Sequence, residues 1–85
     1  MKNCLTIAGS DCSGGAGIQA DLKTFSALGC YGMSVITSVF AENTHALLSS
    51  MSVSQEVIAD QLEAVFSDIR VDAVKIGAVS YTHLT

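Results

Sequence analysis

CLTIAGSDCSGGAGIQADLKTFSAL, residues 4–28, joins a short apolar run to an amphipathic run through a glycine-rich turn. The apolar run at 4–8, which ends at Gly9, is typical of a buried strand. Beyond the turn, apolar side chains recur every three or four residues, which predicts a helix ending before Gly29. Asp21 falls in the first turn of this helix, at the edge of its apolar stripe, so we expect it to be only partly solvated. The stripe consists of Ile18, Leu22, Phe25 and Leu28.

The rest of the chain predicts two more strands and a second helix. Residues 31–40, YGMSVITSVF, are rich in β-branched and aromatic side chains and predict a strand. Ser52 or Ser54 can cap the following helix, and residues 72–78, DAVKIGA, predict the third strand. The order strand–helix–strand–helix–strand predicts an α/β fold with a parallel sheet and helices on its faces. The expected buried face of the second helix consists of Val57, Ile58, Leu62, Val65, Phe66 and Ile69.

The composition narrows the classes of partner. Of the 85 residues, 49% are hydrophobic and 14% are charged. Such a high apolar content in so short a chain indicates an oligomer or a piece of a larger fold. The net charge of −4 argues against nucleic acids and anionic membranes as partners. No apolar run is long enough for a transmembrane helix. The three cysteines form no paired motif, which favours a reduced, cytoplasmic protein, and the spacing of Cys and His indicates no metal site.

The glycine-rich turn at 9–17 allows three interpretations. A phosphate cradle is disfavoured, because the glycine spacing does not fit the dinucleotide fingerprint and no Gly-Lys-Ser/Thr follows for a P-loop. A tight turn into a helix is the simplest structural explanation. The third interpretation is that the glycines let a small ligand approach the backbone closely.

Polar residues gather where a parallel sheet of this kind would bind a ligand, beyond the carboxyl ends of its strands. Asp11 is interpreted as an Asx turn rather than a ligand contact. Glu42 ends a buried strand, where an unpaired carboxylate costs several kcal/mol, so a ligand contact is favoured. Lys75 lies in an apolar strand and predicts a carboxylate nearby. His45 and His83 are expected at the surface, and no catalytic triad is visible.

Two segments resemble a known family. Residues 5–44, LTIAGSDCSGGAGIQADLKTFSALGCYGMSVITSVFAENT, and 61–77, QLEAVFSDIRVDAVKIG, are similar to the N-terminal part of the hydroxymethylpyrimidine/phosphomethylpyrimidine kinases of thiamine biosynthesis. The resemblance implies part of a ribokinase-like fold. It also implies ATP-dependent phosphorylation of 4-amino-5-hydroxymethyl-2-methylpyrimidine and then of its monophosphate. ATP and Mg²⁺ would be the cofactors of a cytoplasmic parent protein that forms a homo-oligomer.

The resemblance implies pyrimidine contacts at Gly9, Asp21, Glu42 and Ala78, and no catalytic residue in this chain. Glu42 stands where many members carry Gln and others carry Glu, and Ala78 replaces a Met that lines the pyrimidine pocket. Phe40 replaces a smaller residue and Cys12 replaces Pro. These differences bear on the shape of the pocket and the stiffness of the turn.

The resemblance also predicts how the chain is divided. Residues 1–78 are expected to be the N-terminal part of the kinase domain, and residues 79–85 a tail outside the family sequence. The isolated chain is then expected to be inactive. Two alternatives remain open: a pyridoxal/pyridoxine kinase of the same fold, and a non-catalytic module that binds the pyrimidine.

Overall fold

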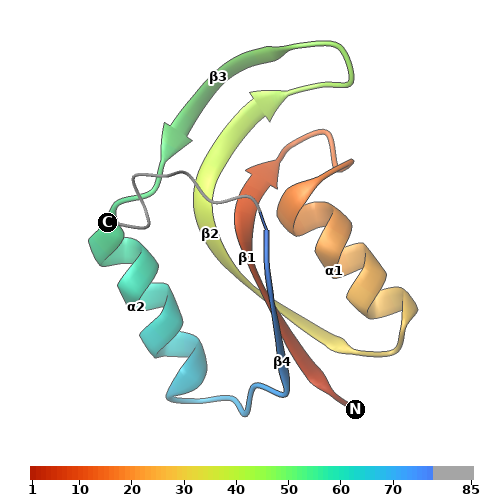
Figure 1. Cartoon of the computed structure of the whole chain (residues 1–85), viewed down its shortest axis with the longest axis vertical. Helices are drawn as coiled ribbons and strands as arrows, with labels where there is room; N and C mark the ends of the chain where they lie inside the picture. The colour runs from red at the N-terminus through yellow and green to blue at the C-terminus, as the bar shows by residue number, and fades with distance from the viewer. Residues whose placement is uncertain (78–85) are drawn as a thin grey trace.

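The computed structural model describes residues 1–77, which form a four-stranded sheet with one helix on each face (Figure 1). The sheet order is β3-β2-β1-β4, with β1 parallel to both β2 and β4. The elements in chain order are β1 (Asn3–Asp11), α1 (Gly17–Ala27), β2 (Tyr31–Glu42), β3 (Leu47–Ser52), α2 (Gln55–Phe66) and β4 (Ala73–Ile76).

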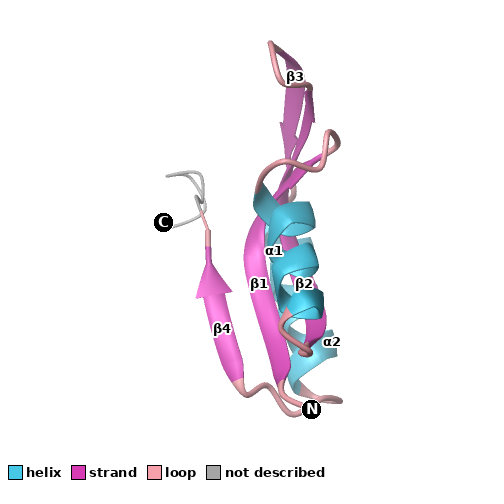
Figure 2. Cartoon of the chain, turned by 90° about the vertical axis from the view of Figure 1, so that its right-hand side faces the viewer, coloured by secondary structure: helices cyan, strands magenta, loops and turns pink. Residues whose placement is uncertain are grey.

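The sheet is mixed, which corrects the predicted wholly parallel β-α-β-α-β order. β3 runs antiparallel to β2, with Ser38 opposite Ser52 and Phe40 opposite Ser50. All six residues of β3 are exposed, so the strand carries no alternation of buried and exposed positions that the sequence could reveal. Figure 2 shows β3 and the adjoining end of β2 projecting past the end of α1.

Successive residues of β1 and β2 point to opposite faces of the sheet. Leu5, Met33 and Val35 form the buried core on the α2 side. Thr6 and Gly32 face α1, and a Cβ on Gly32 would lie 2.9 Å from a side-chain carbon of Leu22. α1 can therefore pack closely on β2. The partly buried residues packed on the core are Ile7, Ile58, Leu62, Val65, Ile69 and Val71.

α1 ends as the sequence predicts but begins earlier. Gly29 has φ +75°, and its N–H donates to the Ser26 carbonyl at 3.0 Å while that of Cys30 donates to the Phe25 carbonyl at 2.9 Å. These are the two bonds of a Schellman motif. Because the helix begins at Gly17, Asp21 lies beyond the first turn, contrary to the prediction. Leu28 follows the helix and is 73% exposed, so it does not belong to the buried stripe.

The start of α2 settles the choice between the two predicted caps. Ser54 is the N-cap, and its Oγ accepts from the Val57 N–H at 3.2 Å, whereas Ser52 belongs to β3. Val57 and Phe66 are about half exposed, which corrects their predicted burial. Neither helix of the described residues is long and apolar enough to cross a membrane.

Candidate functional site

A small hollow of about 110 Å³ lies at the carboxyl ends of β1, β2 and β4. This is the edge at which open α/β sheets bind ligands. Its volume is well below the roughly 300 Å³ at which ligand pockets usually begin, so the described residues form only part of a wall. The lining residues are Ala8, Gly9, Asp11, Ala16, Gly17, Phe40, Glu42, Lys75 and Gly77.

Asp11 organises the glycine-rich turn. Its carboxylate accepts from the N–H and hydroxyl of Ser13, at 2.9 and 2.7 Å, and from the N–H of Gly15 at 3.2 Å. The bonds from Ser13, followed by other backbone N–H groups, hold the pKa of Asp11 below its ordinary value despite partial desolvation. The interpretation of Asp11 as an Asx turn is confirmed. The amides of Ser13 and Gly15, which could have held a phosphate, already bind this carboxylate.

Two glycines allow the turn to close on the strand. Gly17 has φ +59°, and a Cβ there would overlap the carbonyl oxygen of Gly9. A side chain is therefore excluded at Gly17 by both the backbone conformation and the available space. Gly9 lies at an irregularity where Ala8 pairs with Ile36 but Gly9 pairs with Ser38.

Gln19 fastens α1 to the end of β1. Its Oε1 accepts from the Asp11 N–H at 2.8 Å, and its Nε2 donates to the Ser10 hydroxyl at 2.7 Å. β1 extends three residues beyond the apolar run at 4–8 from which the strand was predicted, so residues 9–11 also belong to it. The sequence reasoning did not single out Gln19, because a polar residue on a helix next to an apolar stripe has no distinctive pattern.

Phe40 covers Gly9. A Cβ on Gly9 would overlap the Phe40 ring, with ring atom Cδ2 3.1 Å away and Cζ 3.5 Å away. The aromatic ring therefore lies over the backbone where the family resemblance places the pyrimidine. This position narrows the hollow beside Gly9.

Two neighbouring carboxyls in the hollow have opposite pKa shifts. Partial desolvation, the charge of Asp11 and a hydrogen bond with its carboxyl raise the pKa of Glu42 above its ordinary value. Asp11 is the partner that stays ionised. Such a pair holds one acid charged and brings the other closer to its protonated form.

Asp21 joins α1 to two strands of the sheet. Its Oδ2 accepts from the Thr6 hydroxyl at 2.6 Å and from the Lys75 ammonium at 2.9 Å. Burial acts to raise its pKa, but the bonds from Thr6 and Lys75 and the charge of Lys75 prevail and lower it. The Asp21 side chain is 17% exposed, which confirms the expected partial solvation. The predicted carboxylate partner of Lys75 is Asp21.

The structure thus brings together most of the residues proposed for pyrimidine binding. Gly9 and Glu42 line the hollow directly. Asp21 is not among the residues that line the hollow, but it pairs with Lys75, which does line it. Ala78 lies outside the described residues, as does the predicted tail at 79–85.

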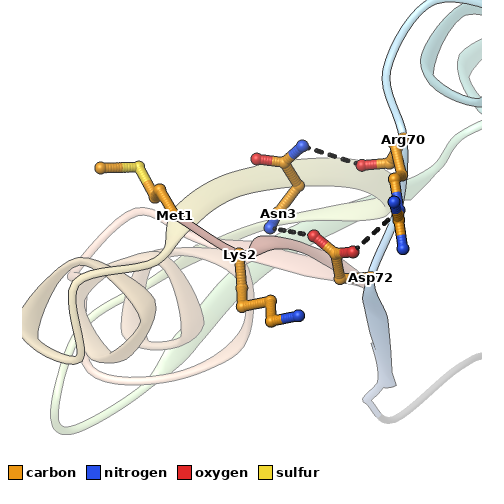
Figure 3. A pocket seen from close by; sticks show the side chains of 5 residues that line it. All are labelled: Met1, Lys2, Asn3, Arg70 and Asp72. Carbon is orange, nitrogen blue, oxygen red and sulfur yellow. Dashed lines mark hydrogen bonds and ion pairs between the residues drawn. The ribbon is translucent and has the colours of Figure 1, made fainter.

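A larger hollow of about 390 Å³ lies at the opposite end of the sheet, where the strands begin (Figure 3). Asp72 accepts there from the Asn3 N–H at 2.8 Å and pairs with Arg70 at 3.2 Å, while the Asn3 side chain donates to the Arg70 carbonyl. These contacts fasten the approach to β4 against the start of β1. Asn3, Arg70 and Asp72 thus bond one another, which gives these three lining residues a structural role. Among residues 1–77, no group of three or more His, Cys, Asp or Glu could hold a metal ion.

Comparison with known proteins assigns the family. The family model described as phosphomethylpyrimidine kinase matches residues 11–85. The chain belongs to the phosphomethylpyrimidine kinase family. The hydroxymethylpyrimidine/phosphomethylpyrimidine kinase of Escherichia coli is 57% identical to this family member over 82 residues, which cover 96% of the chain and 31% of the relative. The chain therefore spans about a third of the length of this curated relative.

Solved structures show how this member of the phosphomethylpyrimidine kinase family folds. A crystal structure of phosphomethylpyrimidine kinase from Clostridium difficile matches with TM-score 0.92 and 60% identity, covering 94% of this chain and 35% of that one. The pyridoxal kinase of Staphylococcus aureus matches with TM-score 0.88 and 40% identity, covering 99% of this chain and 31% of that one. The mixed sheet and two helices correspond to part of these kinase folds.

Proposed function

We propose that the chain forms the pyrimidine-binding part of a kinase that phosphorylates hydroxymethylpyrimidine and then its monophosphate, using ATP. The observation that carries the proposal is the hollow where Gly9 and Glu42 meet at the carboxyl ends of the strands. Family membership, with 57% identity to the E. coli kinase, supports the reaction. Ala78 remains a proposed fourth contact.

The chemistry of the site suits an uncharged aminopyrimidine. Such a ring offers N–H donors on its amino group and acceptors at its ring nitrogens. The ionised carboxylate of Asp21 can only accept a hydrogen bond, whereas a protonated Glu42 can both donate and accept. Its raised pKa brings Glu42 closer to the form that could pair with a ring nitrogen.

The described residues that line the hollow do not fit the phosphates of ATP. The hollow contains the carboxyls of Asp11 and Glu42, and the ammonium of Lys75 is paired with Asp21. Phosphate oxygens would meet like charge there. We therefore assign the ATP phosphates, and the Mg²⁺ that would accompany them, to parts of the kinase other than residues 1–77. We name no catalytic residue among residues 1–77.

A pyridoxal kinase is the alternative favoured by a specific observation, the match to the S. aureus enzyme. The higher identity to phosphomethylpyrimidine kinases, 57–60% against 40%, supports the pyrimidine instead. The two ligands differ at the ring edge, since pyridoxal lacks the amino group that Asp21 or Glu42 would accept from. The Phe40 ring also leaves little room beside Gly9 for the additional ring substituent of pyridoxal.

We also infer a homo-oligomeric parent protein. Its support is the exposed apolar surface of β3, where Leu47, Leu48 and Met51 are each more than half exposed. Contiguous exposed apolar surface is typical of association sites. Sedimentation of the full-length parent and a Leu48→Lys variant tests this inference, with a smaller species expected for the variant.

Titration of the 85-residue chain with hydroxymethylpyrimidine, followed by amide NMR, tests the binding role. We expect shifts at Gly9 and Glu42, weaker binding of pyridoxal, and loss of binding in Glu42→Leu. Glu63→Leu, at an exposed position of α2, is the matched control. Tighter binding of pyridoxal would support the alternative kinase.

Catalysis needs a larger protein, because the chain spans 31% of the E. coli relative. A chimera carrying residues 1–77 in place of the matching part of the E. coli kinase tests it. We expect ATP-dependent phosphorylation of hydroxymethylpyrimidine. A folded chimera that binds the pyrimidine but transfers no phosphate would instead support a non-catalytic binding module.

A further inference from the structure

Lys75 is the cation at the hollow for which the proposed function supplies no role. It is the only Lys or Arg among the residues that line the hollow within the described part of the chain. It lies on β4 directly opposite Thr6 of β1 in the parallel register. Thr6 and Lys75 therefore approach Asp21 from two neighbouring strands on the same face of the sheet.

The two oxygens of Asp21 have unequal surroundings. Oδ2 takes both hydrogen bonds, at 2.6 Å from Thr6 and 2.9 Å from Lys75. No donor among the described residues reaches Oδ1. An ionised carboxylate has lone pairs on both oxygens, so Oδ1 keeps its capacity to accept. The two donors fix the rotation of the carboxylate and leave one oxygen available.

Small residues keep the space beside Lys75 open. A Cβ on Gly77 would lie 3.2 Å from the Lys75 ammonium and 3.0 Å from the Ala8 side chain. The Gly77 N–H donates to the Ile7 carbonyl at 2.9 Å, which holds the end of β4 beside β1. The Lys75 ammonium therefore lies close to both Asp21 and Gly77, and Gly77 lines the hollow.

We propose that Lys75 is a positioning residue for substrate binding, which holds Oδ2 of Asp21 so that Oδ1 accepts from the amino group of the pyrimidine. The inference rests on the proposed function for the identity of the ligand. Thr6 assists from β1 as the second donor. The carboxyls of Asp11 and Glu42 border the same hollow from β1 and β2, so neutralisation by Lys75 also limits repulsion among the acids.

Two substitutions separate positioning from simple cross-linking of the strands. Lys75→Met removes the charge and the donor but keeps a long side chain, whereas Lys75→Arg keeps both at altered geometry. Lys2→Met, at the opposite end of the sheet, removes one lysine charge as a control. Circular dichroism and thermal melts of each chain establish that it is folded.

The first measurement uses the ligand-free 85-residue chain. A pH titration of the Asp21 side-chain carbon by NMR should give a higher Asp21 pKa in Lys75→Met than in the unsubstituted chain. The pKa should return part of the way in Lys75→Arg and should not change in Lys2→Met. An unchanged Asp21 pKa in a folded Lys75→Met chain would overturn the inference. This readout does not depend on which ligand the protein binds.

The second measurement is the affinity for hydroxymethylpyrimidine across pH. At neutral pH, Lys75→Met should bind about tenfold more weakly, as expected for one mispositioned hydrogen bond. As the pH falls, it should lose binding at a higher pH than the parent, because Asp21 becomes protonated earlier. If Lys75→Met melts at a lower temperature but binds with the affinity and pH profile of the unsubstituted chain, the role of Lys75 is only structural. That result would overturn the inference. A shifted Asp21 pKa in chains that all fail to bind supports the Lys75–Asp21 arrangement while rejecting the proposed ligand.

Discussion

Gln61 of α2 bonds both polar backbone groups of Ile36 on β2. Its Oε1 accepts from the Ile36 N–H and its Nε2 donates to the Ile36 carbonyl, each at 2.9 Å. β3 pairs with β2 only from Ser38 onward, so at Ile36 the side-chain amide takes the place of a neighbouring strand. One side chain thereby anchors α2 to the sheet.

Gln61→Leu should lower the free energy of unfolding by about 2 kcal/mol, because it keeps the side-chain size and leaves two backbone groups without partners. Urea denaturation measures the change. Glu63→Leu, at an exposed position of the same helix, should alter the free energy of unfolding far less. Equal effects of the two substitutions would contradict the anchoring role.

Gly17→Ala should destabilise the chain more than Gly29→Ala. Both glycines have positive φ, so both substitutions carry a conformational cost of about 1–2 kcal/mol. A Cβ on Gly29 meets nothing within 4 Å, whereas one on Gly17 overlaps the Gly9 carbonyl oxygen. The overlap should add about 1–3 kcal/mol. Parallel thermal melts measure the difference, and a Gly29→Ala chain at least as unstable as Gly17→Ala would refute the prediction.

Much of the fold follows from local patterns in the sequence. The apolar run before Gly9, the stripe along α1 and the glycine at its end predict β1 and α1, because each is a short-range pattern. β3 could not be predicted in this way. Its exposed residues are held by pairing with β2, which is a property of the tertiary structure.

In the site too, local sequence patterns predict some features, whereas others depend on how the elements pack. Glu42 and Lys75 stood out because charged residues in apolar strands need partners, and the structure gives Lys75 the partner Asp21. The contact of Phe40 with Gly9 and the two bonds of Gln19 each join two different elements of the fold. Such contacts depend on how the strands and helices pack, so no spacing rule reveals them.

Gly9→Ala should destabilise the chain by about 1–3 kcal/mol, because the new methyl group meets the Phe40 ring. Phe40→Val should relieve the clash, so the double variant should lose less stability than the sum of the single variants. Gly15→Ala is the control, since its Cβ would lie an ordinary 3.8 Å from Asp11. Additive losses in denaturant titrations would show that the ring moves aside without cost.

Phe40→Val should also widen the hollow beside Gly9. We expect the affinity of this variant for pyridoxal to rise relative to that for hydroxymethylpyrimidine, because the additional ring substituent of pyridoxal gains space where the Phe40 ring was removed. Competition titrations with the two ligands measure this ratio. An unchanged ratio would mean that Phe40 does not limit the size of the ligand.

Glu42→Gln should stabilise the chain at neutral pH and less so in acid. The folded pKa of Glu42 lies above its ordinary 4.5, so the fold disfavours the ionised form, and this penalty disappears as the pH falls through the folded pKa towards 4.5. Asp11 has the opposite sign: its lowered pKa stabilises the fold above its ordinary 3.8, and that contribution is lost as the pH falls through the folded value.

Thermal melts between pH 4 and pH 8 measure this dependence. Glu63→Gln removes one charge at an exposed position and serves as the control for net charge. The difference in melting temperature between Glu42→Gln and the unsubstituted chain should become smaller as the pH falls. A difference that stays constant over the whole range would contradict the assigned shift.

The carboxylate inside the glycine-rich turn has a consequence for successive rounds of binding. Asp11 serves as an internal anion for the turn, so folding itself orders this segment before any ligand arrives. A pre-organised surface spares each incoming ligand the entropy loss of ordering a loop. Departure of a product would leave the turn in place, and the next molecule would encounter the same rigid surface.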